Sequence, residues 1–263
     1  MDLGLQGKKV LVSGATRGIG KACIEEFAKE GAAIALFARD ENLCSEVLSH
    51  LKKRYPQNIF VMVIAALGLN DSVKKAVDDA AKALGGLDIV VNAAGGSKRG
   101  GLGAVAHDEW MRRLDAKPLG LMAVCEAALP YLEKSDHARI INLSGLHGKE
   151  PVPWAAMAGA INAATHGFSK SLAGSLGPKG ITVNVVTPGF TSGRRFDELI
   201  EITAKERDLS KEGAEAWLRE LVPLGEPVGV EDVAGAVVYL ASKRGKMITG
   251  TEIKVDGGRS RHI

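Results

Sequence analysis

Three glycines, Gly14, Gly18 and Gly20, lie at the spacing GxxxGxG in VLVSGATRGIGKA, residues 10–22. Glycine lets the chain turn tightly and lets its backbone approach a ligand, and the N-terminus of a helix attracts phosphate. The apolar run before these glycines predicts a strand, and the residues after them predict a helix. This context favours a turn that binds the pyrophosphate of a dinucleotide. The alternative is a tight turn with a structural role only.

The residues beside this turn indicate which dinucleotide it binds. An acidic residue at the end of the second strand would hold the ribose 2′-hydroxyl of NAD, but LFARD, residues 36–40, has Ala38 and Arg39 there. Arg17 lies within the glycine turn, and two guanidinium groups suit the 2′-phosphate of NADP(H). Asp40 is the competing feature, and we expect it to cap the next helix instead. The sequence therefore predicts NADP(H) in preference to NAD(H).

Five segments resemble the short-chain dehydrogenase/reductase family, and together they span almost the whole chain. They are SGATRGIG at the glycine turn, NAAG at 92–95, RIINLSG at 139–145, TVNVVTPGF at 182–190 and ITGTEIKVDGG at 248–258. The resemblance implies an oxidoreductase that binds a nicotinamide dinucleotide and a small-molecule substrate and assembles as a dimer or tetramer of identical subunits. The cofactor-binding residues predicted from the turn and the resemblance are Gly14, Thr16, Arg17, Gly18, Ile19, Gly20, Arg39, Asn92, Ala94, Gly95, Pro188, Gly189 and Thr191.

The chain departs from the family at the residues that carry its chemistry. In the family a Tyr exchanges the proton, a Lys lowers its pKa and holds the ribose, a Ser orients the substrate oxygen and an Asn anchors a water. The residues found at the corresponding Asn, Ser, Tyr and Lys positions are Lys117, Gly145, Ala158 and Asn162. Two smaller departures put the adenine contact in doubt: Ala66 replaces an acidic residue and Gly193 replaces a threonine, although Thr191 is close.

The altered positions suggest a rebuilt site. The family's Asn and Lys lie close in space, so the exchange to Lys117 and Asn162 lets an ammonium group reach the same pocket from the opposite helix. His147 follows two residues after Gly145, and histidine suits proton transfer near neutral pH. We expect His147 to be the acid/base or anion-binding group, Lys117 to tune it or hold an oxyanion, and Asn162 to bind ribose or substrate. Ser144 is a weaker candidate, because its side chain could face away from the pocket.

Each of these residues also has an alternative explanation. His147 could be an ordinary polar loop residue. Lys117 precedes Pro118, which bends or ends a helix, so its ammonium group could reach solvent. Ala158 and Asn162 are one helical turn apart and share a face, which could pack against a partner subunit.

The elements that must position these residues alternate between short apolar runs and longer amphipathic segments. We predict strands over residues 8–14, 32–39, 58–65, 87–95, 138–145 and 180–186, with a closing strand within 248–258, and helices over 20–31, 41–54, 72–84, 108–132 and 155–176. This order predicts an α/β fold: a single Rossmann-type domain over 1–263, with a doubly wound parallel sheet of about seven strands and helices on both faces. Residues 190–224 are the irregular part, placed to form a lid or substrate loop.

Composition limits the classes of partner. A net charge of +3 with no long Lys/Arg run argues against nucleic acid, and no apolar run is long enough to span a membrane. Three scattered cysteines and an N-terminus without a signal-like apolar core indicate reduced thiols and a cytoplasmic protein. No metal site is predicted. A basic set on the segments around the expected crevice favours an anionic substrate: Lys98, Arg99, Lys117, His147, Arg194 and Arg195.

Three functions remain open from the sequence. The first is an NADP(H)-dependent oxidoreductase that acts on a small polar or anionic carbonyl or hydroxyl compound through a non-standard acid/base site. The second is a non-redox enzyme, a lyase, hydratase or isomerase, on the same scaffold, because Lys and His can perform enolate chemistry without hydride transfer. The third is a catalytically inactive protein that binds NADP(H) or regulates a partner.

Overall fold

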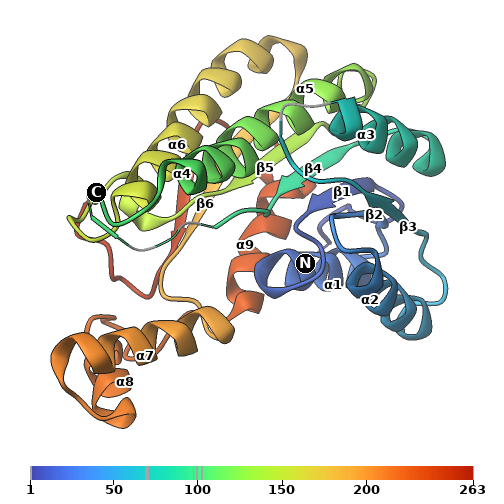
Figure 1. The fold of residues 1–263 in the computed structure, drawn as a ribbon. Coiled ribbons are helices and arrows are strands. Elements are labelled where there is room, and N and C mark those ends of the chain that lie inside the picture. Colours follow the sequence, from blue (N-terminus) through green and yellow to red (C-terminus); the bar gives the residue numbers. More distant parts are fainter. Residues whose placement is uncertain (1, 69–70, 97, 99, 102, 263) are drawn as a thin grey trace.

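A single seven-stranded sheet forms the centre of the protein. The computed structural model describes residues 2–68, 71–96, 98, 100–101 and 103–262. The sheet has the order β3-β2-β1-β4-β5-β6-β7 and every neighbouring pair is parallel, as Figure 1 shows, so the predicted doubly wound sheet of the Rossmann type is confirmed. The strands are β1 (Lys9–Ser13), β2 (Ala33–Ala38), β3 (Phe60–Ile64), β4 (Ile89–Asn92), β5 (Arg139–Leu143), β6 (Thr182–Pro188) and β7 (Glu252–Val255).

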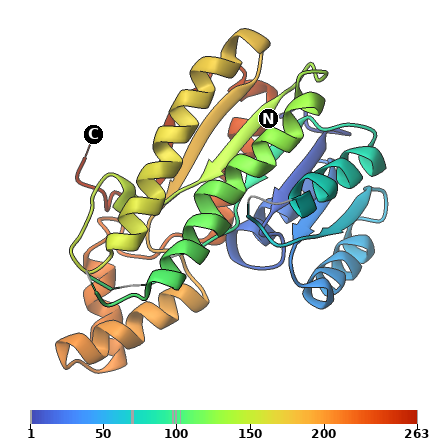
Figure 2. The ribbon, with the colours of Figure 1, turned by 45° about the horizontal axis from the view of Figure 1, so that its top comes forward.

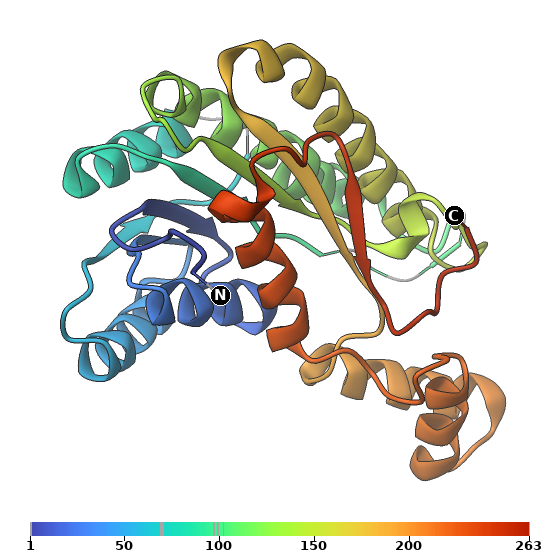
Figure 3. The same ribbon diagram turned by 180° about the vertical axis from the view of Figure 1, so that it is seen from behind.

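Helices cover both faces of this sheet. One face carries α1 (Gly18–Lys29), α2 (Glu41–Arg54) and α9 (Val230–Ala241), seen in front in Figure 3. The other carries α3 (Asp71–Leu84), α5 (Gly120–Leu132) and α6 (Ala156–Leu176), and the last two lie side by side in Figure 2. Two separate apolar cores result, one under each helical layer.

Burial on both faces explains why the strands are nearly continuous runs of apolar residues. All six residues of β2 are buried, and so are all five of β5. The helices that cover the sheet bury one side in a core and expose the other. This difference between strands and helices is why the sequence predicted both kinds of element. The three cysteines are free and buried, as expected for reduced thiols. Within the described part of the chain, no helix combines the length and the apolar character needed to cross a membrane.

The sheet order reverses direction beside β1, whose neighbours are β2 and β4. In open α/β sheets the ligand crevice lies beyond the carboxyl ends of the strands at such a switch point. The loops that follow β1 and β4 touch there: a Cβ added to Gly14 would lie 2.8 Å from the backbone nitrogen of Ala94. Gly14 also has a φ of +73°, which favours glycine.

The predicted helix over 108–132 is present, but it is not regular. It comprises α4 (His107–Leu114), the π-helical turn η1 (Asp115–Leu119) and α5. Pro118 lacks an N–H group and cannot make the usual helical hydrogen bond, yet the chain stays helical through it by widening into the π turn. The proline therefore neither ends the helix nor separates its halves.

Two helices project from the sheet after β6, at the lower left of Figure 1: α7 (Arg194–Arg207) and α8 (Lys211–Glu220). Both lie within residues 190–224, which the sequence analysis described as the irregular part of the chain. Helix α9 was not predicted, and the structure places it against α1 and the sheet. Three short helical turns complete the fold: η2 (Leu146–Gly148), η3 (Gly177–Lys179) and η4 (Lys243–Gly245).

Candidate active site

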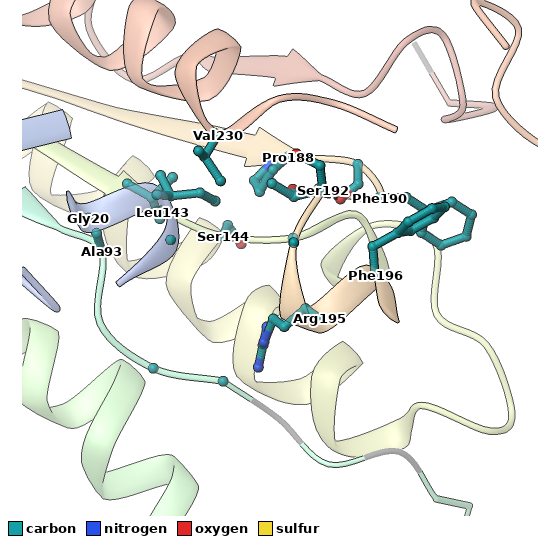
Figure 4. Close-up of a pocket in the computed structure, with 18 of the residues that line it drawn as sticks. Gly20, Ala93, Leu143, Ser144, Pro188, Phe190, Ser192, Arg195, Phe196 and Val230 are labelled. Carbon is teal, nitrogen blue, oxygen red and sulfur yellow. Dashed lines mark hydrogen bonds between the residues drawn. The ribbon is translucent and has the colours of Figure 1, made fainter. Parts of the chain in front are cut away.

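A cavity of about 970 Å³ lies beyond the carboxyl ends of the central strands. Figure 4 shows part of its wall, including Gly20, Ser144, Pro188 and Arg195. It is lined by residues 16–21, Ala93, Gly95, Gly96, Lys117, residues 143–147, Ala158, Ile161, Asn162, residues 188–196, Leu199, Val230, Glu231 and Arg259. Of the predicted catalytic residues, all four line this cavity: Lys117, Ser144, His147 and Asn162.

The glycine turn forms one end of the cavity. Helix α1 begins at Gly18, and its N-cap residue, Arg17, makes no side-chain capping hydrogen bond. The first N–H groups of the helix are therefore left for a ligand or water, which fits an anion such as pyrophosphate. Of the thirteen predicted cofactor-binding residues, those that line the cavity are Thr16, Arg17, Gly18, Ile19, Gly20, Gly95, Pro188, Gly189 and Thr191.

We expect Gly20→Ala to disturb this turn more than a surface change would. A Cβ at residue 20 would overlap the carbonyl oxygen of Gly14 and lie 2.8 Å from its carbonyl carbon, and neither backbone atom can move without opening the turn. The free energy of unfolding should fall by about 1–3 kcal/mol, measured by urea denaturation, and NADPH should bind more weakly. Gly167→Ala is the control, because an added Cβ at this helical glycine meets nothing within 4 Å. Unchanged stability and NADPH affinity in Gly20→Ala would contradict the packing described.

Four predicted cofactor-binding residues do not line the cavity: Gly14, Arg39, Asn92 and Ala94. Gly14 and Ala94 shape the contact between the loops after β1 and β4. Asn92 is buried, and its side-chain amide donates to Oδ1 of Asn142 at 2.9 Å, which ties β4 to β5. Arg39 is exposed and directly follows the carboxyl end of β2. This strand pairs with β1, which leads to Arg17.

Asp40, the competitor of Arg39 for the ribose, begins the next helix. It is the N-cap of α2, and its carboxylate accepts a hydrogen bond from the backbone nitrogen of Leu43 at 3.1 Å. The prediction that Asp40 is a helix cap is confirmed. Its carboxylate is thereby engaged with the helix, which leaves the guanidinium group of Arg39 as the side chain available beyond the end of β2.

Lys117 and Asn162 are paired inside the cavity. The ammonium group of Lys117 donates to Oδ1 of Asn162 at 2.9 Å, and the two residues are only 9% and 8% exposed. The alternative in which Lys117 reaches solvent is therefore wrong. The face of α6 that carries Ala158 and Asn162 lines the cavity, which answers the alternative that it packs against a partner subunit.

Two glycines make room for this pair. A Cβ at Gly95 would lie 2.8–3.0 Å from the Cβ, Cγ and Cδ atoms of Lys117, so the lysine stem lies directly on this glycine. A Cβ at Gly145 would lie 2.8 Å from Nδ2 of Asn162. Small residues at 95 and 145 are thus required by the lysine and the asparagine that occupy the space beside them.

The surroundings of Lys117 change its acidity. Burial lowers the pKa of its ammonium group to about 8, and the positive charge of Arg195 contributes in the same direction. A lysine with such a pKa holds its proton at neutral pH and releases it far more readily than a lysine in water. It can therefore act as a general acid or base near physiological pH.

Ser144 and His147 lie on the same side of the cavity, after β5. The hydroxyl of Ser144 donates to the backbone oxygen of Asn162 at 3.3 Å, and Figure 4 shows its side chain at the cavity wall. Nδ1 of His147 lies 3.3 Å from the backbone oxygen of Glu150, and its ring meets the ring of Trp154 edge-on at 5.1 Å. A hydrogen bond to that backbone oxygen places a proton on Nδ1.

Known proteins resemble this chain over nearly its full length. A family model described as enoyl-(acyl carrier protein) reductase matches residues 14–260. The 3-oxoacyl-(acyl-carrier-protein) reductase FabG of Haemophilus influenzae is 31% identical over 254 residues, which are 97% of this chain and 98% of that protein. The chain belongs to the short-chain dehydrogenase/reductase family. By family it is an NAD(P)H-dependent oxidoreductase.

Solved structures of the family superpose closely on this one. The L-sorbose reductase of Gluconobacter frateurii, complexed with NADPH and L-sorbose, has a TM-score of 0.93 at 25% identity, with 100% of both chains covered. An NADPH-bound short-chain oxidoreductase of Pseudomonas aeruginosa PAO1, described as containing an atypical catalytic center, has a TM-score of 0.87 at 26% identity. The comparison covers 98% of this chain and 100% of that one.

Several cavity residues were not singled out from the sequence. Phe190 and Phe196 form an aromatic wall, with ring centroids 6.2 Å apart, and the guanidinium group of Arg259 lies 4.0 Å from the centroid of the Phe190 ring. Their place depends on how the segments after β6 and β7 meet, for which the sequence gives no local signal. Arg113 lies beside the cavity, where it donates to the backbone oxygen of Gly96. The sequence does give a signal for this residue, because it precedes Lys117 by four residues and a helix places two such side chains on one face.

Proposed function

We propose that the protein is an NADPH-dependent reductase of a small carbonyl compound in which Lys117 supplies the proton. The observation that carries the proposal is the buried ammonium group of Lys117, held at 2.9 Å by Asn162 within the cavity that the glycine turn borders. When bound, NADPH supplies the hydride. This proposal replaces the sequence-based assignment of acid/base chemistry to His147.

The altered residues of the family site support a rebuilt acid. Ala158 stands at the position of the family's tyrosine and has no ionisable group, whereas Asn162 stands at the position of its lysine. The Lys117 ammonium group lies in the same cavity, so a proton donor is retained although its source is different. The Pseudomonas aeruginosa protein described as having an atypical catalytic center supports the idea that this fold accepts other constellations.

Each side chain then has one task. Lys117 uses one N–H to Asn162 and has two more with which to hold the carbonyl oxygen and to donate a proton as the alcohol forms. Lys117 regains that proton from water. Ser144 offers an oxygen lone pair to the same region, and His147, whose ring meets that of Trp154, lines the cavity on the same side.

We expect the cofactor preference to depend on Arg39. An ionic hydrogen bond to the 2′-phosphate is worth about 1.5–3 kcal/mol, so Arg39→Ala should weaken NADPH binding about 10–100-fold and leave NADH unchanged. Both affinities can be followed by melting temperature, since a ligand at 100 times its Kd stabilises the fold by about 2.7 kcal/mol. Arg54→Ala, at the far end of α2, is the control. Equal losses for NADPH and NADH would contradict this assignment.

The direct test of function follows NADPH absorbance with a panel of small carbonyl compounds. Oxidation of one NADPH per alcohol formed supports a reductase. Turnover of a compound without any change in NADPH would favour the second candidate, a lyase, hydratase or isomerase. That candidate draws on the same Lys117, because a lysine with a lowered pKa also serves as a base or forms a Schiff base. A protein that binds NADPH and turns over nothing would be a binding or regulatory protein.

The same proposal includes a cytoplasmic location, a homo-oligomeric assembly and the movement of residues 190–224 as a lid. The cytoplasmic location rests on the three scattered, free cysteines, and the assembly rests on the family resemblance. The lid rests on α7, whose first residues, Arg194, Arg195 and Phe196, line the cavity while the rest of the helix projects from the sheet.

A further inference from the structure

Arg195 reaches across the cavity from the start of α7. The helix begins at Arg194, directly after Gly193, which has a φ of +95°. In Figure 4 the Arg195 side chain extends toward the segment that follows β4. A Cβ at Gly96 would overlap its terminal nitrogen Nη2, so the guanidinium group lies directly against this glycine. Arg195 is accessible to water, and it is reached through the cavity that it lines.

The neighbours of Arg195 are also cations. Nη1 of Arg113 donates to the backbone oxygen of Gly96 at 3.2 Å, so two guanidinium groups meet at one glycine. Lys117 lies one helical turn beyond Arg113 and lines the cavity. Burial lowers the pKa of the Arg195 guanidinium group. The charge of Glu198 opposes this shift, and the charges of Arg113 and Arg194 add to it.

The nearby carboxylates are already engaged with other cations. Oε1 of Glu109 accepts from Nε of Arg113 at 2.8 Å, and its other oxygen pairs with Arg112. Glu198 pairs with Arg194 at 3.4 Å. Among the residues that the structure describes, none places a carboxylate within ion-pair distance of Arg195 or Lys117. Arg195 and Lys117 therefore line the cavity with no carboxylate of the described residues paired to either side chain, which leaves both cations able to bind an anionic ligand.

We propose that this end of the cavity binds an oxyanionic group of the substrate, a carboxylate or a phosphate, with Arg195 as its main contact. The inference rests on the proposed function, because the anion belongs to the carbonyl compound whose oxygen Lys117 holds. A guanidinium group presents two N–H donors in a fork that matches a carboxylate or phosphate. Arg113 adds positive charge at the same place, while its Nε and Nη1 atoms donate to Glu109 and to the backbone of Gly96. The substrate class is then an oxo acid or a phosphorylated carbonyl compound.

The test measures anion binding rather than turnover. Malonate, inorganic phosphate and the neutral malonamide are titrated by calorimetry into the NADP⁺-saturated protein at constant ionic strength. We expect malonate or phosphate to bind and malonamide not to bind, and the stronger anion identifies the group. Arg195→Met should weaken anion binding about 10–100-fold, as expected for the loss of an ionic hydrogen-bonded pair. Lys205→Met is the control, because it removes a positive charge from an exposed part of the same helix that does not line the cavity.

Gly96→Ala provides a second variant. It keeps Arg195 but displaces its guanidinium group, because the new methyl group would occupy the place of Nη2. We expect weaker anion binding in this variant as well, with the affinity for NADP⁺ unchanged in both.

Wild-type anion affinity in Arg195→Met and Gly96→Ala would overturn the proposal. So would a loss confined to NADP⁺, since Arg195 would then serve the cofactor. No binding of either anion to the wild-type protein would overturn it too. Because binding is measured without turnover, these outcomes are independent of whether hydride transfer occurs, which the absorbance assay decides.

Discussion

Lys117→Met is expected to lower kcat/KM for carbonyl reduction by about 10²–10⁴-fold, the usual cost of removing a general acid. Methionine keeps the unbranched stem that lies on Gly95 and removes the ammonium group. The carbonyl oxygen then develops negative charge without a proton donor or a cation beside it. The loss should appear mainly in kcat, since the interaction strengthens as the charge forms. The measurement is the steady-state rate of NADPH oxidation with the best substrate of the carbonyl panel.

Lys170→Met is the matched control for this prediction. Its ammonium group donates to the backbone oxygen of Gly250 at 3.0 Å on the exposed side of α6, away from the cavity. We expect its rate to stay within twofold of wild type, and both variants to bind NADPH. If Lys117→Met retained the wild-type rate and His147→Ala lost it, the proton donor would be His147, as the sequence alone suggested. If both were silent, the acid/base site would lie elsewhere.

Much of the fold follows from the sequence because each strand is buried on both faces. Strands such as β2 and β5 are short apolar runs between amphipathic helices, and this contrast is visible without coordinates. Helix α9 escaped prediction for the opposite reason. Its segment VEDVAGAVVYLA has few polar residues after its first turn, and a short apolar run of this kind does not distinguish a buried helix from a strand.

The candidate site was predictable where it depends on spacing, and not where it depends on long-range packing. The sequence predicted that Lys117 and Asn162 lie close in space, and the 2.9 Å hydrogen bond between them confirms this. The π turn that carries Lys117 had only Pro118 as a signal. The approach of Arg195 to Gly96 joins segments about 100 residues apart, and no local pattern specifies it.

The altered residues support one another physically. Lys117 needs the space above Gly95, and Asn162 needs the space beside Gly145, the residue that we aligned with the family's serine. A serine at 145 would place its Cβ 2.8 Å from the Asn162 amide, so the asparagine and the glycine are compatible only together. A site decaying at random would not be expected to leave a buried ammonium group with a hydrogen-bond acceptor and room for its stem. This agreement favours a site that was rebuilt for chemistry over one that was lost.

The pH dependence of the wild-type reductase should reflect Lys117. Its pKa of about 8 lies below the ordinary lysine value, and reduction uses the protonated form. The rate should therefore be at its plateau below pH 8 and fall about tenfold for each pH unit above it, since the ammonium group is lost there. Oxidation of the alcohol uses the neutral amine, so its rate should rise through the same pH range.

Asn162→Asp should move this limb to higher pH by about 1–3 units, because a carboxylate within hydrogen-bond distance stabilises the ammonium form of Lys117. Asn162→Ala should move it below 8, because the buried ammonium group loses its acceptor while the charge of Arg195 still acts on it. At pH 9.5 the aspartate variant should therefore keep more of its proton donor than the wild type, and the alanine variant less. The measurement is kcat for NADPH oxidation between pH 6 and 10. Opposite shifts in the two variants are specific to an acid held by Asn162, whereas a residue that only supports the fold would change the rate at every pH alike. Identical limbs in all three proteins would assign the titrating group to another residue.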